Sequence, residues 1–398
     1  MGRGRYRFLV GALTLVAVSA ALGLGFFMRP LVKALRGFRT MSVWTGAPII
    51  NMAINARAER LLGVRTKSIV LNTYFTTARF DVVLRNYFSA DWWVWVAPFA
   101  GFVLICLIAD RVHCYCDGGI LPSSRRMTFN RLEMFTYRLL RIPVFLWTYG
   151  ADVRSRFATK ALGEPNCCTD CTDVGRACVC DDVLWQENFA YLRRNARAVF
   201  SMGDMMEYTP GSRNDLFFWP IDFARDEGTR YEAAYPELIT TRPLRVVHAP
   251  NHRQFKGTKY LEAAVTALQA EGIPIELILV ERVPNDQALA IYRTADIVFD
   301  QCLIGFHGYF AIEAMALGKP VMCFIRDPER YLLHPEECPI LNIHRDELGD
   351  SLRMYATTGR SSLPEIGRES RLYVEKYFSM EAFAGRLKRC YSDLKVAA

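Results

Sequence analysis

The sequence lacks the features that mark repetitive, disordered or nucleic-acid-binding proteins. No segment of the 398 residues is of low complexity, and no stretch recurs at a fixed period, which excludes solenoids and fibrous proteins. The net charge is +8, but no motif of a nucleic-acid-binding fold accompanies this charge. We therefore expect a globular protein that has no nucleic acid as a partner.

Charge is also missing from one long segment near the N-terminus. Residues 8–28 contain no charged side chain, and as a helix at about 1.5 Å per residue they would span roughly 30 Å, the thickness of a bilayer core. We expect a hydrophobic anchor with basic flanks over residues 1–38. The alternatives are a signal peptide cleaved after Val18-Ser19-Ala20, and a helix that is buried or lies on the membrane.

Basic residues on both sides of this segment predict contact with a membrane surface. Acidic lipid headgroups attract such clusters of positive charge. The charge counts on the two sides are close, so they do not settle the orientation of the helix. Seven basic residues precede the first expected strand: Arg3, Arg5, Arg7, Arg29, Lys33, Arg36 and Arg39.

The length of the chain predicts two domains, because 398 residues exceed one ordinary hydrophobic core. Short apolar runs alternate with helical patterns, which predicts parallel, doubly wound sheets that bind ligands at the carboxyl ends of their strands. We expect strands near residues 41–44, 68–71, 110–113, 142–148, 198–202, 244–248, 275–280 and 297–300. We expect helices near residues 51–62, 92–109, 260–270, 288–294 and 379–394.

Residues 295–321, ADIVFDQCLIGFHGYFAIEAMALGKPV, form the most informative stretch. A short apolar strand ends at Asp300, a loop with two glycines follows over residues 302–308, and a helix begins at Tyr309 and stops at Gly318. Unpaired backbone N–H groups and the helix dipole make such a loop a phosphate site. Glu313 lies just over one turn into the helix, where its carboxylate can accept hydrogen bonds from a polyol. The alternative is an ordinary strand–turn–helix of an α/β sheet.

The segment from Glu313 to Val321, EAMALGKPV, resembles the second-domain signature of glycosyltransferase family 4. These are retaining enzymes of the GT-B fold. The resemblance implies an α/β protein with two doubly wound Rossmann-like domains facing a cleft, here with an added N-terminal hydrophobic helix. The family usually has a first glutamate eight positions before the second, and this sequence has Gly305 there.

The resemblance also implies a set of donor-binding residues. Glu313 would hold the nucleotide ribose, and Glu281 would lie near the base. Because Gly305 has no carboxylate, the sugar would be read by the amides of residues 306–308 or by the ring of His307, although His307 could equally be an exposed loop residue. The donor-binding residues expected in this way are Gly46, Glu281, Gly305, Phe306, His307, Gly308, Tyr309 and Glu313.

Arg253 and Lys256 form the strongest catalytic pair in the sequence. They lie in the loop after the strand 244–248, where the family uses an arginine and a lysine to stabilise the departing diphosphate. No Asp-x-Asp occurs in the chain, and metal-dependent transferases use that motif to hold a divalent ion. We therefore expect no catalytic metal. The alternative is a solvated basic loop.

Four residues of the first domain are further candidates: Tyr115 and Asp117 for catalysis, and His113 and Asp152 for the acceptor side. His113 and Tyr115 occupy the two positions of a His-x-His that the family often has, and Tyr115 would donate a hydrogen bond in place of the second histidine. Asp117 could act as an acceptor-side base. Asp152 belongs to a Gly-x-Asp that lines the cleft in the family.

Five cysteines crowd into residues 167–180. Cys168, Cys171, Cys178 and Cys180 could supply the four thiolates of a tetrahedral structural zinc site. Disulfides or a redox pair are the alternatives.

These observations predict a retaining, metal-independent glycosyltransferase that uses a nucleotide-sugar donor and a glycan or lipid-linked acceptor in cell-envelope polysaccharide synthesis. It would be membrane-associated, with its catalytic domains in the cytoplasm. A GT-B epimerase and an inactive sugar-binding scaffold are the alternatives. The expected parts are a domain over 39–222 with a Cys-rich insertion at 166–182, a linker at 223–242, a nucleotide-sugar domain over 243–376 and a crossing helix at 377–398.

Overall fold

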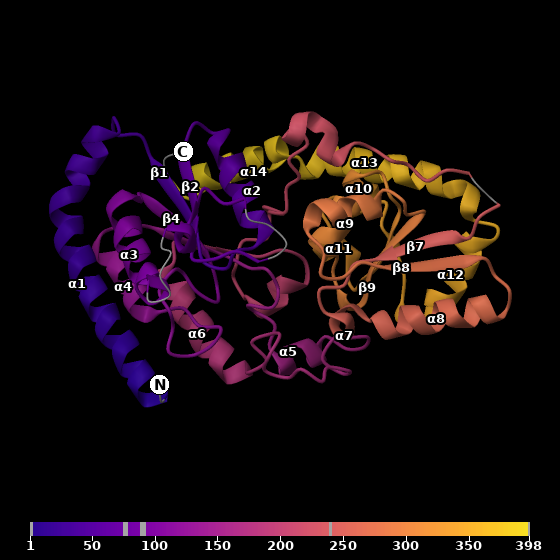
Figure 1. The fold of residues 1–398 in the computed structure, drawn as a ribbon, viewed down its shortest axis with the longest axis horizontal. Helices are drawn as coiled ribbons and strands as arrows, with labels where there is room; N and C mark the ends of the chain where they lie inside the picture. Colours follow the sequence, from indigo (N-terminus) through magenta and orange to yellow (C-terminus); the bar gives the residue numbers. More distant parts are fainter. Residues whose placement is uncertain (1–2, 75–78, 88–92, 239–240, 397–398) are drawn as a thin grey trace. The chain divides into compact units, whose positions relative to one another are not determined.

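The computed structural model describes residues 3–74, 79–87, 93–238 and 241–396, with the side chains of residues 3–7 and 93–94 left aside. The chain divides into two compact units (Figure 1). The first comprises residues 1–155, 175–216 and 384–398, and the second comprises residues 156–174 and 217–383.

The first unit is built on a six-stranded parallel sheet with the order β3-β2-β1-β4-β5-β6. Its strands are β1 (Met41–Thr45), β2 (Arg65–Val70), β3 (Val82–Val83), β4 (Arg111–Tyr115), β5 (Val144–Trp147) and β6 (Ala198–Phe200). Its helices are α1 (Arg3–Leu35), α2 (Ile50–Arg60), α3 (Trp93–Ile108), α4 (Arg131–Leu139) and α6 (Asp182–Asn195).

The second unit is built on a five-stranded parallel sheet with the order β11-β10-β9-β7-β8. Its strands are β7 (Leu244–His248), β8 (Ile275–Leu279), β9 (Ile297–Gly305), β10 (Val321–Ile325) and β11 (Leu341–Asn342). Its helices are α5 (Arg156–Ala161), α7 (Arg253–Lys256), α8 (Thr258–Ala270), α9 (Asn285–Tyr292), α10 (Tyr309–Ala316), α11 (Pro328–Tyr331), α12 (Leu348–Ala356), α13 (Leu363–Phe378) and the first residues of α14 (Met380–Asp393).

The prediction of parallel, doubly wound sheets is confirmed, and the strand orders locate the ligand edges. The order reverses between β1 and β4 in the first sheet and between β7 and β9 in the second. At such switch points the loops leaving neighbouring strands diverge to opposite faces and open a crevice at the carboxyl ends. The residues following these four strands are therefore the ones to inspect for function.

One expectation about the stretch 295–321 is wrong in detail. Residues 302–305 were expected to be loop, but β9 continues to Gly305 with shifts in its register against β10. The side chain of Gln301 accepts hydrogen bonds from the N–H groups of Leu303 (2.7 Å) and Ile304 (2.6 Å), which holds this irregular end of the strand. The helix start at Tyr309 is confirmed.

Helix α1 packs lengthwise on the first unit, running beside α3 and α4 (Figure 1). Its buried residues include Ala17, Ala21 and Arg29. A Cβ atom on Gly25 would lie 2.8 Å from Leu140 Cδ2, so the helix approaches the end of α4 closely. One helix in the described residues, Phe8–Leu35, is long and apolar enough to cross a membrane. Of its most apolar stretch, 28% is buried against the rest of the protein.

Part of the basic flank of α1 binds the protein itself. Lys33 lies 2.7 Å from Asp110, and the guanidinium of Arg36 binds the same carboxylate. The guanidinium of Arg29 donates to the carbonyl of Ala109 at 2.9 Å. These charges therefore fasten the end of α1 to the end of α3.

The expected final helix is confirmed as α14, and its capping residue is the one expected. Ser379 Oγ accepts a hydrogen bond from the N–H of Ala382 at 3.2 Å. From Ala384 onward the helix belongs to the first unit. There the hydroxyl of Tyr391 donates to Glu59 Oε1 at 2.7 Å, which ties the last helix to α2.

Candidate active site

The crevice of the second unit contains a buried ion pair. Lys256 ends α7, the short helix after β7, and its Nζ lies 2.5 Å from Oδ1 of Asp300 on β9. The backbone N–H of Gly308 donates to the other carboxylate oxygen at 2.5 Å. Burial raises the pKa of Asp300, but the charge of Lys256 and these hydrogen bonds outweigh burial and lower it. The pair thus holds a cation at the N-terminus of α10.

Gly308 lies close to this ion pair. A Cβ atom there would lie 2.8 Å from Lys256 Nζ and 3.3 Å from Asp300 Oδ1. A side chain would therefore push the ammonium group away from the loop. The loop amides were expected to face a sugar, yet the N–H of Gly308 already donates to Asp300.

Glu313 is buried one turn into α10 and accepts hydrogen bonds from two side chains. The hydroxyl of Tyr231 and the amide of Asn285 each donate to Glu313 Oε1 at 3.0 Å. Burial raises the pKa of Glu313, and these two donors partly offset that effect. The carboxylate is therefore held in one orientation, as a ligand for a polyol requires.

Arg253 begins α7 and is exposed, in contrast to Lys256. Its guanidinium makes a two-point contact with Glu281, with Nε at 2.9 Å and Nη2 at 2.7 Å, and a further contact with Glu262 at 3.0 Å. Two residues singled out from the sequence, Arg253 and Glu281, are thereby brought together. An exposed pair of this kind is readily exchanged for an anionic ligand.

The loop between β9 and α10 is more buried than the sequence indicated. Phe306 and His307 are each 2% exposed, so the alternative of an exposed His307 is wrong. Burial lowers the pKa of His307 to about 4, which leaves the ring neutral at pH 7. Its Nδ1 has no hydrogen-bond partner among the described residues. The hydroxyl of Tyr309 donates to the carbonyl of Pro220 at 3.1 Å.

The backbone at Gly305 does not favour a glutamate. Its φ of +93° lies in the left-handed region, where a side chain is strained. A Cβ atom would also lie 3.1 Å from Cβ and Nε of Arg326, the residue after β10. Arg326 Nη1 donates to the carbonyl of Leu162 at 3.0 Å, so its guanidinium occupies this region and binds the segment before the Cys-rich insertion.

In the first unit, the switch point brings Gly46 and the segment after β4 together. Gly46 has a φ of +109°, and a Cβ atom there would lie 2.7 Å from the carbonyl oxygen of Gly118. Only glycine allows this approach. The loops that follow β1 and β4 are therefore in contact at the carboxyl edge.

Asp117 and Asp152 form an acidic pair at the same edge. The hydroxyl of Tyr149 donates to Asp117 Oδ2 at 2.7 Å, and the N–H groups of Tyr149 and Gly150 each donate to Asp152 Oδ1 at 2.9 Å. Burial raises the pKa of both carboxyl groups, and the charge of Asp117 raises that of Asp152 further. Within the described residues, Asp117 Oδ1 and Asp152 Oδ2 have no hydrogen-bond partner. One of the two groups can therefore carry a proton near neutral pH.

His113 and Tyr115 face away from solvent. The ring of His113 is fully buried and stacks on Trp44, with ring centroids 4.1 Å apart. Trp147 Nε1 donates to its Nδ1 at 3.1 Å, and Tyr391 Oη lies 3.2 Å from its Nε2. Tyr115 is 4% exposed, and burial raises its pKa. The acceptor-side role of His113 and the catalytic role of Tyr115 stay predictions, and in this structure His113 packs in the core.

No family model and no curated protein matches the chain. Solved structures match its fold. Sucrose-phosphate synthase from Thermosynechococcus elongatus matches with a TM-score of 0.58 and 12% identity, covering 90% of this chain and 99% of that one. HepE from Anabaena, determined in complex with UDP-glucose, matches with a TM-score of 0.56 and 10% identity, covering 89% of this chain and 99% of that one. OtsA matches with a TM-score of 0.51 and 10% identity, covering 90% of this chain and 100% of that one.

The chain has the GT-B fold. Its two parallel sheets of six and five strands, each with helices on its faces, are the two Rossmann-like domains of that fold, and the expected N-terminal apolar helix is present.

The Cys-rich segment is divided between the two units. Cys168 and Cys171 belong to the second unit, whereas Cys178 and Cys180 belong to the first. Across the described ranges, the one grouping of close potential ligands is the exposed set His334, Glu336 and Glu337, and exposed acidic groups of this kind are common without an ion. The structural zinc site stays a prediction, which elemental analysis of the purified protein tests.

Several residues of the second crevice were missed by the sequence reading. Asp300 was recognised only as the end of a strand, although a charged residue that ends an apolar strand is itself a signal of a functional edge. Tyr231 lies in the expected linker, yet it is 2% exposed and binds Glu313. Asn285 and Arg326 carried no local signal, because their roles depend on contacts distant in sequence.

Proposed function

We propose that the protein is a retaining, metal-independent glycosyltransferase that moves a sugar from a nucleotide-sugar donor to a glycan or lipid-linked acceptor in cell-envelope polysaccharide synthesis. The observation that supports this proposal is the arrangement of Lys256, Asp300 and Glu313 at the switch point of the second unit. A cation, a helix N-terminus and a fixed carboxylate there match the diphosphate and ribose of a nucleotide sugar.

Lys256 and Arg253 would stabilise the diphosphate as the glycosidic bond breaks. Asp300 keeps Lys256 charged and positioned in the absence of ligand, and the phosphate would then become its partner. The exposed Arg253 would exchange Glu281 for the second phosphate. Positive charge placed at the leaving group lowers the barrier because the negative charge there grows in the transition state.

The acceptor would meet the first domain, where Asp117 lies at the carboxyl edge. A retaining reaction does not require a strong base, because the departing phosphate can take the proton of the acceptor. Asp117 would orient the acceptor hydroxyl through its free oxygen. The catalytic domains would lie on the cytoplasmic side of the membrane, where activated sugars are made.

The donor is identified first by thermal stabilisation across a panel of nucleotide sugars, because a ligand that binds the native state raises the melting temperature. UDP-glucose is the first candidate, since the structure of HepE holds it. Release of nucleoside diphosphate in the presence of a membrane extract then reports transfer, and a chelator should leave the rate unchanged.

Lys256→Ala should lower the transfer rate by about 10²–10³-fold, the effect of removing one preorganised charge from a transition state. Arg253→Ala tests the same role with little risk to folding, because Arg253 is exposed. The matched control is Arg245→Ala, another exposed arginine of the second unit that pairs with a glutamate. Full activity in both Lys256→Ala and Arg253→Ala would refute the phosphate roles.

Two other outcomes would replace the proposal. Epimerisation of the donor without an acceptor would identify an epimerase. Nucleotide binding without turnover over a broad acceptor panel would identify a sugar-binding scaffold, which the departures at Gly305 and Tyr115 from the family pattern would explain. An inverted anomeric configuration in the product would refute the retaining mechanism.

A further inference from the structure

A cavity of about 960 Å³ lies in the first unit beside α1, away from the residues discussed so far. We call it the α1 cavity. One wall consists of Val10, Gly11 and Thr14 of α1, and the others come from the segment 122–132 and the first turns of α6. No residue of the proposed donor or acceptor sites lines it.

The wall formed by α1 is continuous with an exposed apolar surface of the same helix. Many exposed residues of α1 are large and apolar, and Leu15 and Val16, next in sequence to Thr14 of the cavity wall, are 58% and 67% exposed. A single exposed apolar residue needs no explanation, but a whole helix face does. Such a face is stable when it lies in the interfacial region of a bilayer. The opening of the cavity would then be level with the lipid headgroups.

The opposite wall carries positive charge. Arg125 lies 3.8 Å from Glu187, and both side chains are more than half exposed, so this pair is weak. The guanidinium of Arg131 stacks on the ring of Tyr191, 5.1 Å from its centroid, which leaves its N–H groups able to donate. Arg125 and Arg131 together outnumber Glu187, the one carboxylate among the lining residues.

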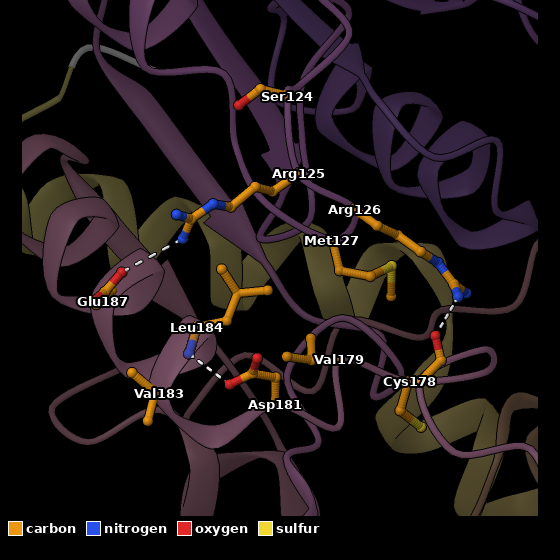
Figure 2. Close-up of a pocket in the computed structure, with 11 residues that line it drawn as sticks. Ser124, Arg125, Arg126, Met127, Cys178, Val179, Asp181, Val183, Leu184 and Glu187 are labelled. Atoms are coloured by element: carbon orange, nitrogen blue, oxygen red, sulfur yellow. Dashed lines mark hydrogen bonds and ion pairs between the residues drawn. The ribbon is translucent and has the colours of Figure 1, made fainter. Parts of the chain in front are cut away.

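A neighbouring pocket of about 500 Å³ helps to show which of two adjacent arginines lines the α1 cavity (Figure 2). Arg125 lines both spaces, whereas Arg126 lines only the smaller one. Figure 2 shows the two side chains extending in opposite directions, with Arg125 reaching toward Glu187. Arg126 donates to the carbonyl of Gly175 at 2.5 Å. The chain therefore offers an adjacent arginine of equal charge as a control.

We propose that the α1 cavity binds the phosphate-bearing head of a membrane lipid, with Arg125 and Arg131 on the phosphate and the hydrocarbon chain along α1. This rests on the proposed function and goes beyond it, because it holds the protein at a membrane surface through a cavity that no residue of the donor or acceptor sites lines. An apolar wall facing two guanidinium groups matches an amphiphile with an anionic head. A free phosphate would use the arginines but not the apolar wall.

The test measures binding rather than turnover. The full-length protein is mixed with vesicles of phosphatidylcholine alone or with phosphatidic acid, and the bound fraction is measured by flotation. Arg125→Ala and Arg131→Ala should each lower affinity for the phosphatidic acid vesicles by about tenfold, the loss of one charge-assisted hydrogen bond. Arg126→Ala should change it less than twofold.

A second pair of variants tests the cavity by steric blocking. A Cβ atom on Gly11 or on Gly23 meets nothing within 4 Å, and both glycines lie on α1. Gly11 lines the cavity and Gly23 does not. Gly11→Trp should abolish the preference for phosphatidic acid, while Gly23→Trp should retain it. Thermal melting of each variant confirms that it is folded.

The outcomes separate this inference from the proposed function. Equal losses in Arg125→Ala and Arg126→Ala would reduce the effect to general surface charge and overturn the site. Saturation of the site by inorganic phosphate, with no preference for the lipid, would make it a free anion site and also overturn it. Lipid binding that depends on Arg125 in a protein without sugar transfer would refute the function and leave the lipid site standing.

Discussion

The buried ion pair of Lys256 and Asp300 in the second unit lies at the switch point of its sheet, whereas the buried pair of Glu59 and Arg111 in the first unit lies in the core. In the second unit, Lys256 of α7, the helix that follows β7, meets Asp300 of β9, and these two strands flank the switch point. In the first unit, Glu59 forms an ion pair with Arg111, whose Nε lies 3.1 Å from Glu59 Oε1. Glu59 also accepts hydrogen bonds from Trp44 Nε1 at 2.7 Å and from the hydroxyl of Tyr391.

This difference indicates a difference in task. A charge at the strand ends can exchange its internal partner for a ligand, as we propose for Lys256. The fully buried carboxylate of Glu59 on α2 has partners from β1, β4 and α14. It cannot exchange them for a ligand, and instead fixes how these elements assemble. At the edge of the first unit, the pair Asp117 and Asp152 suits a neutral hydroxyl better than a phosphate, because both groups are acidic.

The largest expected effect is on the buried pair of the second unit. Asp300→Ala leaves the ammonium of Lys256 buried without its partner, and breaking such a pair costs about 3–5 kcal/mol of unfolding free energy. Chemical denaturation measures the loss. As the matched control, Glu281→Ala breaks the exposed pair with Arg253 and should cost no more than about 1 kcal/mol. Similar costs in the two variants would show that Lys256 is not buried as described.

A smaller effect is expected in the core cluster of the first unit. Tyr391→Phe removes a hydroxyl that donates to Glu59, and should cost about 1–3 kcal/mol because Glu59 is left short of a donor in the core. Urea denaturation followed by tryptophan fluorescence reports this, since Trp44 and Trp147 both lie in the cluster. Tyr191→Phe removes a more exposed hydrogen bond to the carbonyl of Arg131 and serves as the control. An unchanged stability in Tyr391→Phe would show that α14 does not depend on this contact.

The smallest effect concerns pH and the acidic pair at the first edge. Burial raises the pKa of Asp152 above its unfolded value, so the native state binds the proton more tightly than the unfolded state. Its contribution to stability is therefore complete below about pH 4 and is lost as pH rises through the native pKa. Asp152→Asn keeps Oδ1 for the N–H groups of Tyr149 and Gly150 and removes the ionisation.

The Asp152→Asn variant should consequently lose less stability than the wild type between acidic and neutral pH. Parallel melting curves over this range measure the difference. Asp215→Asn, which replaces an exposed carboxylate of the first unit bound to Arg213, should not flatten the profile. Identical profiles for the wild type and Asp152→Asn would mean that Asp152 is ionised in the native state without cost.

Much of the fold could be predicted from the sequence because its signals are local. The apolar run 244–248 is strand β7 at the predicted bounds, and Tyr309 begins α10 as expected. Tyr309 to Gly318 carries its own start and stop signals, so no distant contact is needed to define the helix. The strands β3 and β11 were missed because each has two residues, too few to show the alternation of apolar and polar residues that marks a strand. β10 was missed although its run VMCFI is apolar throughout.

The sequence by itself determined the type of most elements, the carboxyl edges and the residue types placed there, including Lys256 and Glu313. Only the tertiary structure decided their partners. The fold pairs Lys256 with Asp300, 44 positions later in the sequence, and Glu313 with Tyr231, 82 positions earlier. It also places Arg326 beside Gly305. The same holds for α1, whose composition fits a bilayer span but whose packing on α3 and α4 places it along the first unit. Local periodicity fixes backbone conformation, whereas burial and pairing depend on contacts between distant residues.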